Sequence, residues 1–267
     1  MIKDSNAPKK SSKLKSLGKL LTKLLAYGGC AALSLILTVK SPELHSKWMR
    51  HKVGTRVFTM KPHDKYPGGG TGFQVEAASG KSFVITNDHV CEVSTDKQTM
   101  VAIDESGNSY KLKILQKSDY SDLCILEGVP NLSGLKLGSN VSLGDIVEAV
   151  GHPSLLPLTT AKGEVIAVTD VDILHAWIKE DIYMDGIDES ECSKPKNEIT
   201  RSGGGRLACL DITKGAYQTN MVIRPGSSGS PVVNSWGNVV GVAFAGDRYN
   251  WGCFVSLNDL KHILSTY

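Results

Sequence analysis

The sequence contains no C-x-x-C pair, although six cysteines occur among its 267 residues. The missing pair excludes the common zinc and redox motifs, and six cysteines in a chain of this length do not make a dense disulfide framework. Cys91 and Cys124 lie beside apolar residues, which predicts two buried, unreactive thiols. Cys192 and Cys209 flank one long loop and could pair as a disulfide if the domain lies outside the cytosol.

A strong net charge is also missing, since the chain carries only +3. Residues 1–23 contain seven Lys and one Asp and therefore contribute +6, which leaves −3 on the rest of the chain. A mildly acidic body argues against nucleic acid as the main partner. The basic part is a tail.

Residues 24–39 form a run of sixteen residues without a charge. A membrane-spanning helix needs about 20 apolar residues, and the span 20–39 reaches this length if Lys23 snorkels. We predict a transmembrane or signal-anchor helix at 20–39, after a basic tail at 1–19 and before a polar linker at 40–52.

Two other interpretations of this segment stay open: a cleaved signal peptide of a secreted protein, and a buried core helix. No A-x-A site follows the apolar residues, which argues against cleavage. The basic tail favours a cytoplasmic N-terminus, with the rest of the chain on the non-cytoplasmic side. Five basic residues beyond the segment weaken this bias: Lys40, Lys47, Arg50, Lys52 and Arg56.

The remaining chain lacks a ten-residue amphipathic helix and an internal repeat. Short apolar and β-branched runs alternate with Gly, Asp, Asn and Ser clusters, which is typical of strands. The first set is 53–61, 71–76, 82–86, 99–104, 109–116 and 122–127, and the second is 146–150, 159–169, 206–212, 216–223, 230–234, 239–245 and 252–255. This pattern predicts an all-β domain at 53–267 of two antiparallel barrels or sandwiches, at 53–130 and 140–256, with a closing helix at 257–265.

An acidic stretch at 178–205 interrupts the second set of strands. Its spacing does not match the EF-hand loop, so we interpret it as a long solvated loop and predict no metal site.

The stretch RPGSSGSPVV, at 224–233, places three serines between glycines and prolines before an apolar run. Small residues let a backbone turn tightly and approach another group closely. A serine hydroxyl becomes a good nucleophile only with a base in hydrogen-bond reach and a third group that orients the base. Without a histidine and an acid elsewhere in the chain, this stretch would be only a turn.

His89 is the candidate base, because only Asn87 and Asp88 separate it from the apolar run FVIT. A strand that ends in a short turn can hold an imidazole rigidly at a sheet edge. Asp122 is the candidate acid, since apolar residues follow it at once, whereas Asp119 lies in a polar turn and is a weaker choice. The alternatives are a structural histidine at a strand end and an aspartate that forms a turn.

The chain order His89, Asp122, Ser228 resembles that of the trypsin-like (chymotrypsin-fold) serine proteases, in the style of the HtrA/Deg branch and the bacterial glutamyl endopeptidases. The resemblance rests on Gly72-Phe73 ahead of ITNDHV, then DLCIL, PGSSGSPVVN and NVVGVAFAG. Residues 144–145, 149–153 and 162–165 match the family's second-barrel pattern, and the likeness runs over about 53–266.

This resemblance implies two six-stranded barrels and a serine endopeptidase acting on protein or peptide substrates. The family pattern G-x-S-G-[GS]-P selects Ser228 rather than Ser227 or Ser230 as the nucleophile. The backbone N–H groups of Gly226 and Ser228 would form the oxyanion hole, and the implied acyl-enzyme mechanism requires no metal or cofactor.

By the family's spacing, Val222 lies at the base of the substrate pocket. The strand with Val242, Ala243, Phe244 and Ala245 forms a wall. No acid stands at the base, which disfavours Lys or Arg before the cleaved bond, and GVAFAG lacks the histidine that glutamyl endopeptidases use. We therefore expect a small or medium apolar residue there. No PDZ-like domain follows before Tyr267, unlike in the HtrA/Deg branch.

Other function classes stay open. The α/β-hydrolase motif G-x-S-x-G fails at Ser230 and lacks a following helix. A pseudoprotease that only binds peptides, or a membrane-tethered structural module in which RPGSSGSP is a turn, would use the same sequence without catalysis.

Overall fold

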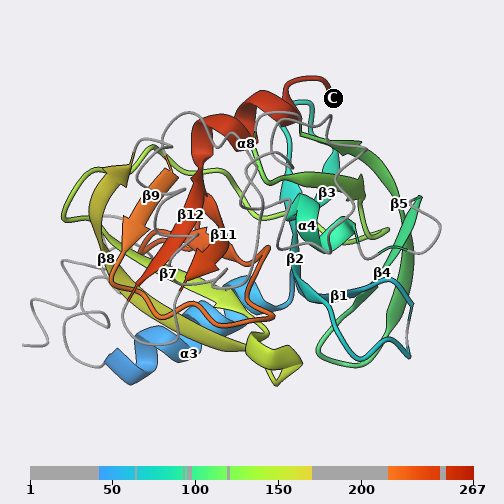
Figure 1. The fold of residues 1–267 in the computed structure, drawn as a ribbon, viewed down its shortest axis with the longest axis horizontal. Helices are drawn as coiled ribbons and strands as arrows, with labels where there is room; N and C mark the ends of the chain where they lie inside the picture. The colour runs from blue at the N-terminus through green and yellow to red at the C-terminus, as the bar shows by residue number, and fades with distance from the viewer. Residues whose placement is uncertain are drawn as a thin grey trace, which may run out of the picture. The chain divides into compact units, whose positions relative to one another are not determined.

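The computed structural model describes residues 42–63, 65–92, 94, 98–118, 121–169, 216–246 and 251–267 (Figure 1). The predicted membrane segment 20–39, Asp119, the predicted strand at 206–212, the loop 178–205 and the pair Cys192 and Cys209 lie outside these residues. Within the described ranges, no helix combines the length and the apolar character needed to cross a membrane.

The first half of the domain is a closed antiparallel barrel whose strands follow the order β1-β2-β3-β6-β5-β4. Alternate side chains point inward, as in β4, where Met100 and Ala102 are buried between partly exposed neighbours. Phe58, Met60, Val84 and Leu126 belong to the same core. The strands are β1 (Val57–Lys61), β2 (Gly70–Glu76), β3 (Ser82–Thr86), β4 (Thr99–Ile103), β5 (Ser109–Lys117) and β6 (Cys124–Glu127).

The second half is another closed antiparallel barrel, with the order β10-β11-β12-β9-β8-β7. Its core includes Val147, Val165, Val232 and Phe254. The strands are β7 (Ile146–Gly151), β8 (Thr159–Thr169), β9 (Ala216–Thr219), β10 (Pro231–Val233), β11 (Val239–Gly246) and β12 (Gly252–Ser256). The prediction of two six-stranded barrels is therefore confirmed.

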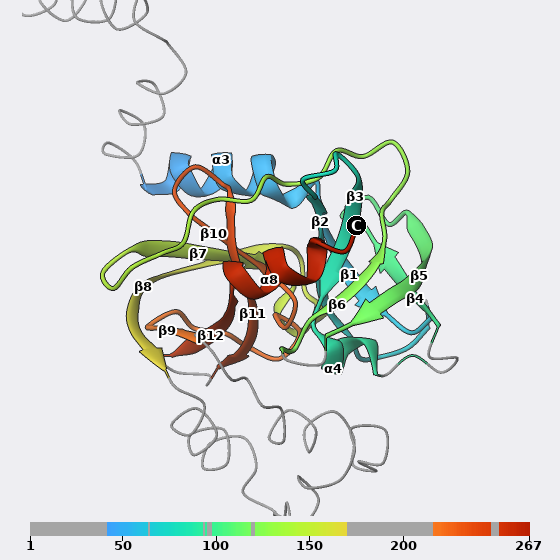
Figure 2. The same cartoon turned by 90° about the horizontal axis from the view of Figure 1, so that it is seen from above.

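The segment between the barrels is attached to both of them. Leu135 forms a bridge with Val75 of β2, and Leu137 forms one with Val239 of β11. The closing helix α8 (Leu257–Leu264) is capped at its N-terminus by Ser256, whose hydroxyl accepts the N–H of Asp259 at 3.1 Å. The helix packs on β11 and β12, and Figure 2 shows its end directed toward β3.

A helix, α3 (Pro42–Gly54), occupies most of the predicted polar linker at 40–52. Residues 49–267 form one compact unit, and in it Met49 and Val53, one helical turn apart, are completely buried. Two apolar residues among many charged ones make too short a pattern to predict a helix. The first strand consequently starts at Val57 rather than at residue 53.

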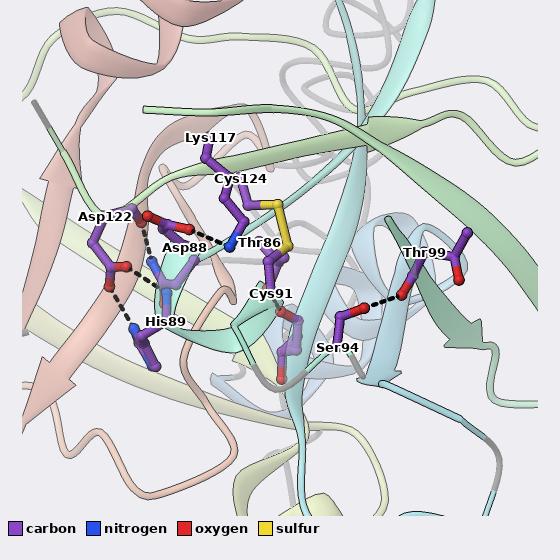
Figure 3. Close-up of a disulfide and its surroundings, with 11 residues drawn as sticks. Thr86, Asp88, His89, Cys91, Ser94, Thr99, Lys117, Asp122 and Cys124 are labelled. Atoms are coloured by element: carbon purple, nitrogen blue, oxygen red, sulfur yellow. Dashed lines mark hydrogen bonds and ion pairs between the residues drawn. A yellow bond between two sulfur atoms is a disulfide. The ribbon is translucent and has the colours of Figure 1, made fainter. Parts of the chain in front are cut away.

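The prediction of two separate buried thiols is wrong, because Cys91 and Cys124 form a disulfide (Figure 3). Both residues are buried as expected. Cys124 begins β6 and pairs with Thr86 of β3, while Cys91 ends the short helix α4 (Asp88–Cys91) that follows β3. A cross-link over 33 residues stabilises the fold by roughly 3–4 kcal/mol in the chain-entropy description.

Candidate active site

His89 and Asp122 meet because β3 and β6 are neighbours in the first barrel. His89 lies in α4, just after β3, and Asp122 lies two residues before the start of β6. The His89 Nδ1 atom is 2.6 Å from Asp122 Oδ2, and the backbone N–H of His89 donates to Asp122 Oδ1 at 3.0 Å (Figure 3). Asn87 Nδ2 donates to the Asp122 carbonyl at 2.8 Å. The carboxylate is fully buried, and it holds His89 at two points, the ring and the backbone.

The electrostatic environment favours the protonated form of His89. Burial by itself lowers the pKa of His89, but the charge and hydrogen bond of Asp122, and then the charge of Asp88, raise it above its ordinary 6.5. An ionised carboxylate is an acceptor only, so Nδ1 carries the hydrogen and Nε2 is the basic nitrogen of the neutral ring. The His89–Asp122 pair contributes folding stability that is fully present below the pKa of His89 in the unfolded chain. This contribution is lost as the pH rises through the higher pKa of His89 in the folded protein.

A tight turn shapes the backbone just before Ser228. Ser227 N–H donates to the Arg224 carbonyl at 2.9 Å, Pro225 is the second residue of the turn, and Gly226 has φ +89°, as in a type II turn. The Pro225 carbonyl accepts Ser154 N–H at 2.6 Å. Because a trans amide directs its C=O and N–H oppositely, the Gly226 N–H points away from Ser154.

Of the three serines in the loop, Ser228 is the accessible one. Ser227 is 7% exposed and Ser230 is 1% exposed, whereas Ser228 is half-buried. The N–H groups of Gly226 and Ser228 make no hydrogen bond within the described part of the chain. Ser228 Oγ donates to the Phe244 carbonyl at 3.3 Å, and among the described residues it makes no hydrogen bond to His89.

Thr71 of β2, which the sequence analysis missed, ties the serine loop to the first barrel. Its N–H donates to the Ser228 carbonyl at 2.8 Å, and its Oγ1 donates to the Gly226 carbonyl at 2.8 Å. The same Oγ1 accepts His152 N–H at 3.0 Å. In the sequence, the only indication of a role for Thr71 was its position directly before Gly72-Phe73, one of the motifs of the family resemblance.

Gly70, the residue before Thr71, brings the histidine and serine segments together. A Cβ at Gly70 would lie 2.6 Å from Val90 Cγ2 and 2.9 Å from the Ser228 carbonyl oxygen. Such contacts are too close for any side chain, so only glycine fits. The side chain of Val90, which follows His89, and the backbone of Ser228 are therefore both packed against the start of β2.

The predicted pocket residues are only partly brought together. Val222 lines a cavity of about 470 Å³ beside the serine loop, with β7, β8 and the 3-10 turn η1 (Pro153–Leu155) forming its other described walls. The four predicted residues of β11, Val242, Ala243, Phe244 and Ala245, are buried, and Ala243 belongs to the barrel core.

A residue that was not predicted, Ile223, packs against two glycines that pair across β11 and β12, Gly246 and Gly252. A Cβ at Gly246 would lie 2.6 Å from Ile223 Cβ, and a Cβ at Gly252 would collide with Ile223 Cγ1. The Ile223 side chain therefore occupies the place that side chains at these two glycines would take. Only the tertiary structure reveals this, since Ile223 lies more than 20 residues before both glycines.

Residues 70–242 match the family model of the trypsin-like peptidase domain. The serine protease Do-like HtrA of Lactobacillus helveticus is 23% identical over 65% of this chain and 34% of its own length. The protein of the same name from Bacillus subtilis is 24% identical over 75% of this chain and 39% of its own length. The chain thus spans roughly a third of the length of such curated relatives.

Solved structures share the fold. The active form of the Rv3671c protease from M. tuberculosis has a TM-score of 0.57 at 18% identity, covering 81% of this chain and 82% of that one. The HtrA-type protease AlgW with a tripeptide has a TM-score of 0.56 at 16% identity, covering 82% of this chain and 62% of that one. At these identities the likeness concerns the fold alone.

Replacing Thr71 with Val should destabilise the domain more than replacing it with Ser. Val leaves the Gly226 carbonyl and His152 N–H without the hydroxyl that bridges them, which costs about 1–3 kcal/mol. Ser keeps the hydroxyl and loses only a methyl group. Urea unfolding of both variants measures the difference, and equal stabilities would show that the bridge contributes nothing.

Proposed function

The chain belongs to the trypsin-like peptidase family, and we propose that it is a serine endopeptidase that hydrolyses protein substrates with His89, Asp122 and Ser228. The observation that carries the proposal is the buried Asp122 carboxylate 2.6 Å from His89 Nδ1, together with a serine loop whose Gly226 and Ser228 N–H groups make no hydrogen bond to the described residues. The HtrA-like relatives support the same class of reaction.

In the proposed reaction, the Ser228 hydroxyl turns from the Phe244 carbonyl toward His89. Hydrogen bonds of this kind often form only once substrate is bound. His89 Nε2 takes the hydroxyl proton while Ser228 Oγ bonds to the peptide carbonyl carbon, and Asp122 stabilises the resulting imidazolium. The imidazolium then protonates the leaving amine as the C–N bond breaks, and water repeats the sequence to release the acyl group.

The oxyanion of the tetrahedral intermediate would accept hydrogen bonds from the N–H groups of Gly226 and Ser228. The direction of the Gly226 N–H depends on the Pro225 carbonyl, which Ser154 holds from the opposite side. Loss of one such donor lowers the rate on the order of 10²–10³-fold in related enzymes. The serine loop is therefore a preorganised part of the proposed site.

We further propose that the residue before the cleaved bond is small or medium-sized and apolar. Val222 offers no charge to pair with Lys or Arg, and burial of an unpaired charge is costly. Ile223 packs against the paired glycines Gly246 and Gly252, which limits the room for a large side chain.

A fluorophosphonate should label the full chain once, at Ser228. The label forms only if the hydroxyl is activated, so Ser228→Ala should lose it completely. Ser230→Ala is the matched control, because the neighbouring Ser230 hydroxyl is buried and makes no hydrogen bond within the described residues. Intact mass spectrometry reads the result. A folded wild-type chain without a label, or a label that persists in Ser228→Ala, contradicts the proposal.

Shortening Ile223 should widen the substrate range. In Ile223→Ala, peptides with Leu or Phe before the cleaved bond should gain roughly 10-fold in kcat/KM relative to peptides with Ala, in line with the discrimination of apolar pockets. A peptide library measured on both proteins tests this, with Ile223→Val as the conservative control. An unchanged preference for the residue before the cleaved bond would show that Ile223 does not limit the substrate pocket.

We also propose that residues 20–39 anchor the protein in a membrane, with the protease domain on the non-cytoplasmic side. The uncharged run and the basic tail support the anchor, and the Cys91–Cys124 disulfide supports an oxidising compartment.

Deletion of residues 1–39 should release the protein from carbonate-washed membranes into the soluble fraction. Alkylation of intact cells before lysis should still leave a Cys91–Cys124 linked peptide of the full chain. A full chain in the soluble fraction would refute the membrane anchor. Free thiols at both Cys91 and Cys124 would refute the oxidising compartment.

A further inference from the structure

A second acid lies beside His89 and has no part in the proposed reaction. Asp88 directly precedes His89 in α4, and its side chain is only 1% exposed. A buried carboxylate is costly unless a partner compensates its charge. The Lys117 ammonium, at the end of β5, is 3.1 Å from Asp88 Oδ1 (Figure 3).

The ion pair is held by the same strands as the histidine site. Lys117 pairs in register with Cys124 of β6, and Cys124 is two residues beyond Asp122. Figure 3 shows the His89 ring directed toward Asp122 and the Asp88 carboxylate directed toward Lys117. The two acids thus serve different partners, although they lie on adjoining segments.

The two members of the ion pair differ in their contact with water. The Lys117 side chain is 29% exposed, so solvent screens its charge, whereas the Asp88 carboxylate is almost completely desolvated. The negative charge of Asp88 is therefore the less screened of the two. The charged groups that act on His89 are Asp122, from the segment before β6, and Asp88, from its own helix, with Lys117 of β5 facing Asp88.

We propose that Asp88 is a positioning residue of the histidine site, whose ion pair with Lys117 sets the pH range over which His89 serves as the base. This inference rests on the proposed function. The Asp88 charge stabilises the imidazolium that forms when Ser228 loses its proton, which favours the reaction at neutral and alkaline pH. The same charge keeps His89 protonated in mild acid, where it can accept no proton.

Asp88→Asn should therefore change the shape of the pH profile rather than only its height. Without the carboxylate the imidazolium is less stable, so the acid limb of kcat/KM should move to lower pH. We expect kcat/KM at about pH 5.5, taken relative to each protein's own plateau near pH 8.5, to rise about two- to fivefold. The plateau itself should fall, since the imidazolium loses stabilisation in the transition state.

Two further variants separate charge from folding. Glu127→Gln removes an exposed acid from the far end of β6, and its profile should match that of the wild type. Asp88→Asn together with Lys117→Gln removes both members of this ion pair, and the acid limb of its profile should still lie at lower pH than that of the wild type. A uniformly depressed curve with an unmoved limb in both Asp88 variants would assign Asp88 a purely structural role and overturn the inference.

A second readout does not depend on activity. NMR titration of His89 in full-length Ser228→Ala, with and without Asp88→Asn, should show a lower midpoint when Asp88 is absent. If the midpoint falls while the wild type fails to react with the fluorophosphonate, Asp88 sets the proton affinity of His89 but the proposed function fails. If the wild type reacts and the midpoint does not move, the inference fails and the proposed function stands.

Discussion

Four registered residue pairs join β3 to β6, from Phe83 with Glu127 to Thr86 with Cys124, and the histidine site depends on this pairing. Because the strands are antiparallel, the residues that leave β3 lie against those that enter β6. His89 thereby meets Asp122, and Cys91 meets Cys124. The disulfide and the buried hydrogen bonds hold the same two segments, so the imidazole has little freedom relative to its carboxylate.

The serine loop belongs to the other barrel, and Thr71 links the two halves. Its backbone and hydroxyl contact the carbonyls of Ser228 and Gly226, while His152 donates to the hydroxyl from the second barrel. Gly70 lets the segments of both barrels approach the start of β2. A site divided between two barrels needs such a connection, since neither barrel alone fixes the serine relative to the histidine.

Electrostatics adds a second level of control to this geometry. Burial opposes a charged imidazole, and two carboxylates, Asp122 and Asp88, oppose that effect. Only Asp122 forms a hydrogen bond with the ring. Lys117 neutralises the Asp88 charge in part, and because Lys117 is partly exposed, it compensates that charge less than a buried cation would. In this arrangement the chain can adjust the proton affinity of His89 without altering the hydrogen bond that orients it.

Local patterns in the sequence determined the strands at 82–86 and 159–169, the helix at 257–264 and the tight turn in RPGSSGSP, because alternation, capping and Gly-Pro chemistry act over a few residues. They also picked out His89 and Asp122 at strand edges, whereas the family pattern selected Ser228 among three serines, and the segment 20–39 stays a prediction from sequence. Only the tertiary structure decided the Cys91–Cys124 disulfide and the bridge made by Thr71. The same holds for the ion pair of Asp88 with Lys117 and for the packing of Ile223 against two paired glycines. Each of these contacts joins residues that are distant in the chain, and whether they meet depends on strand order and register, which no local pattern encodes.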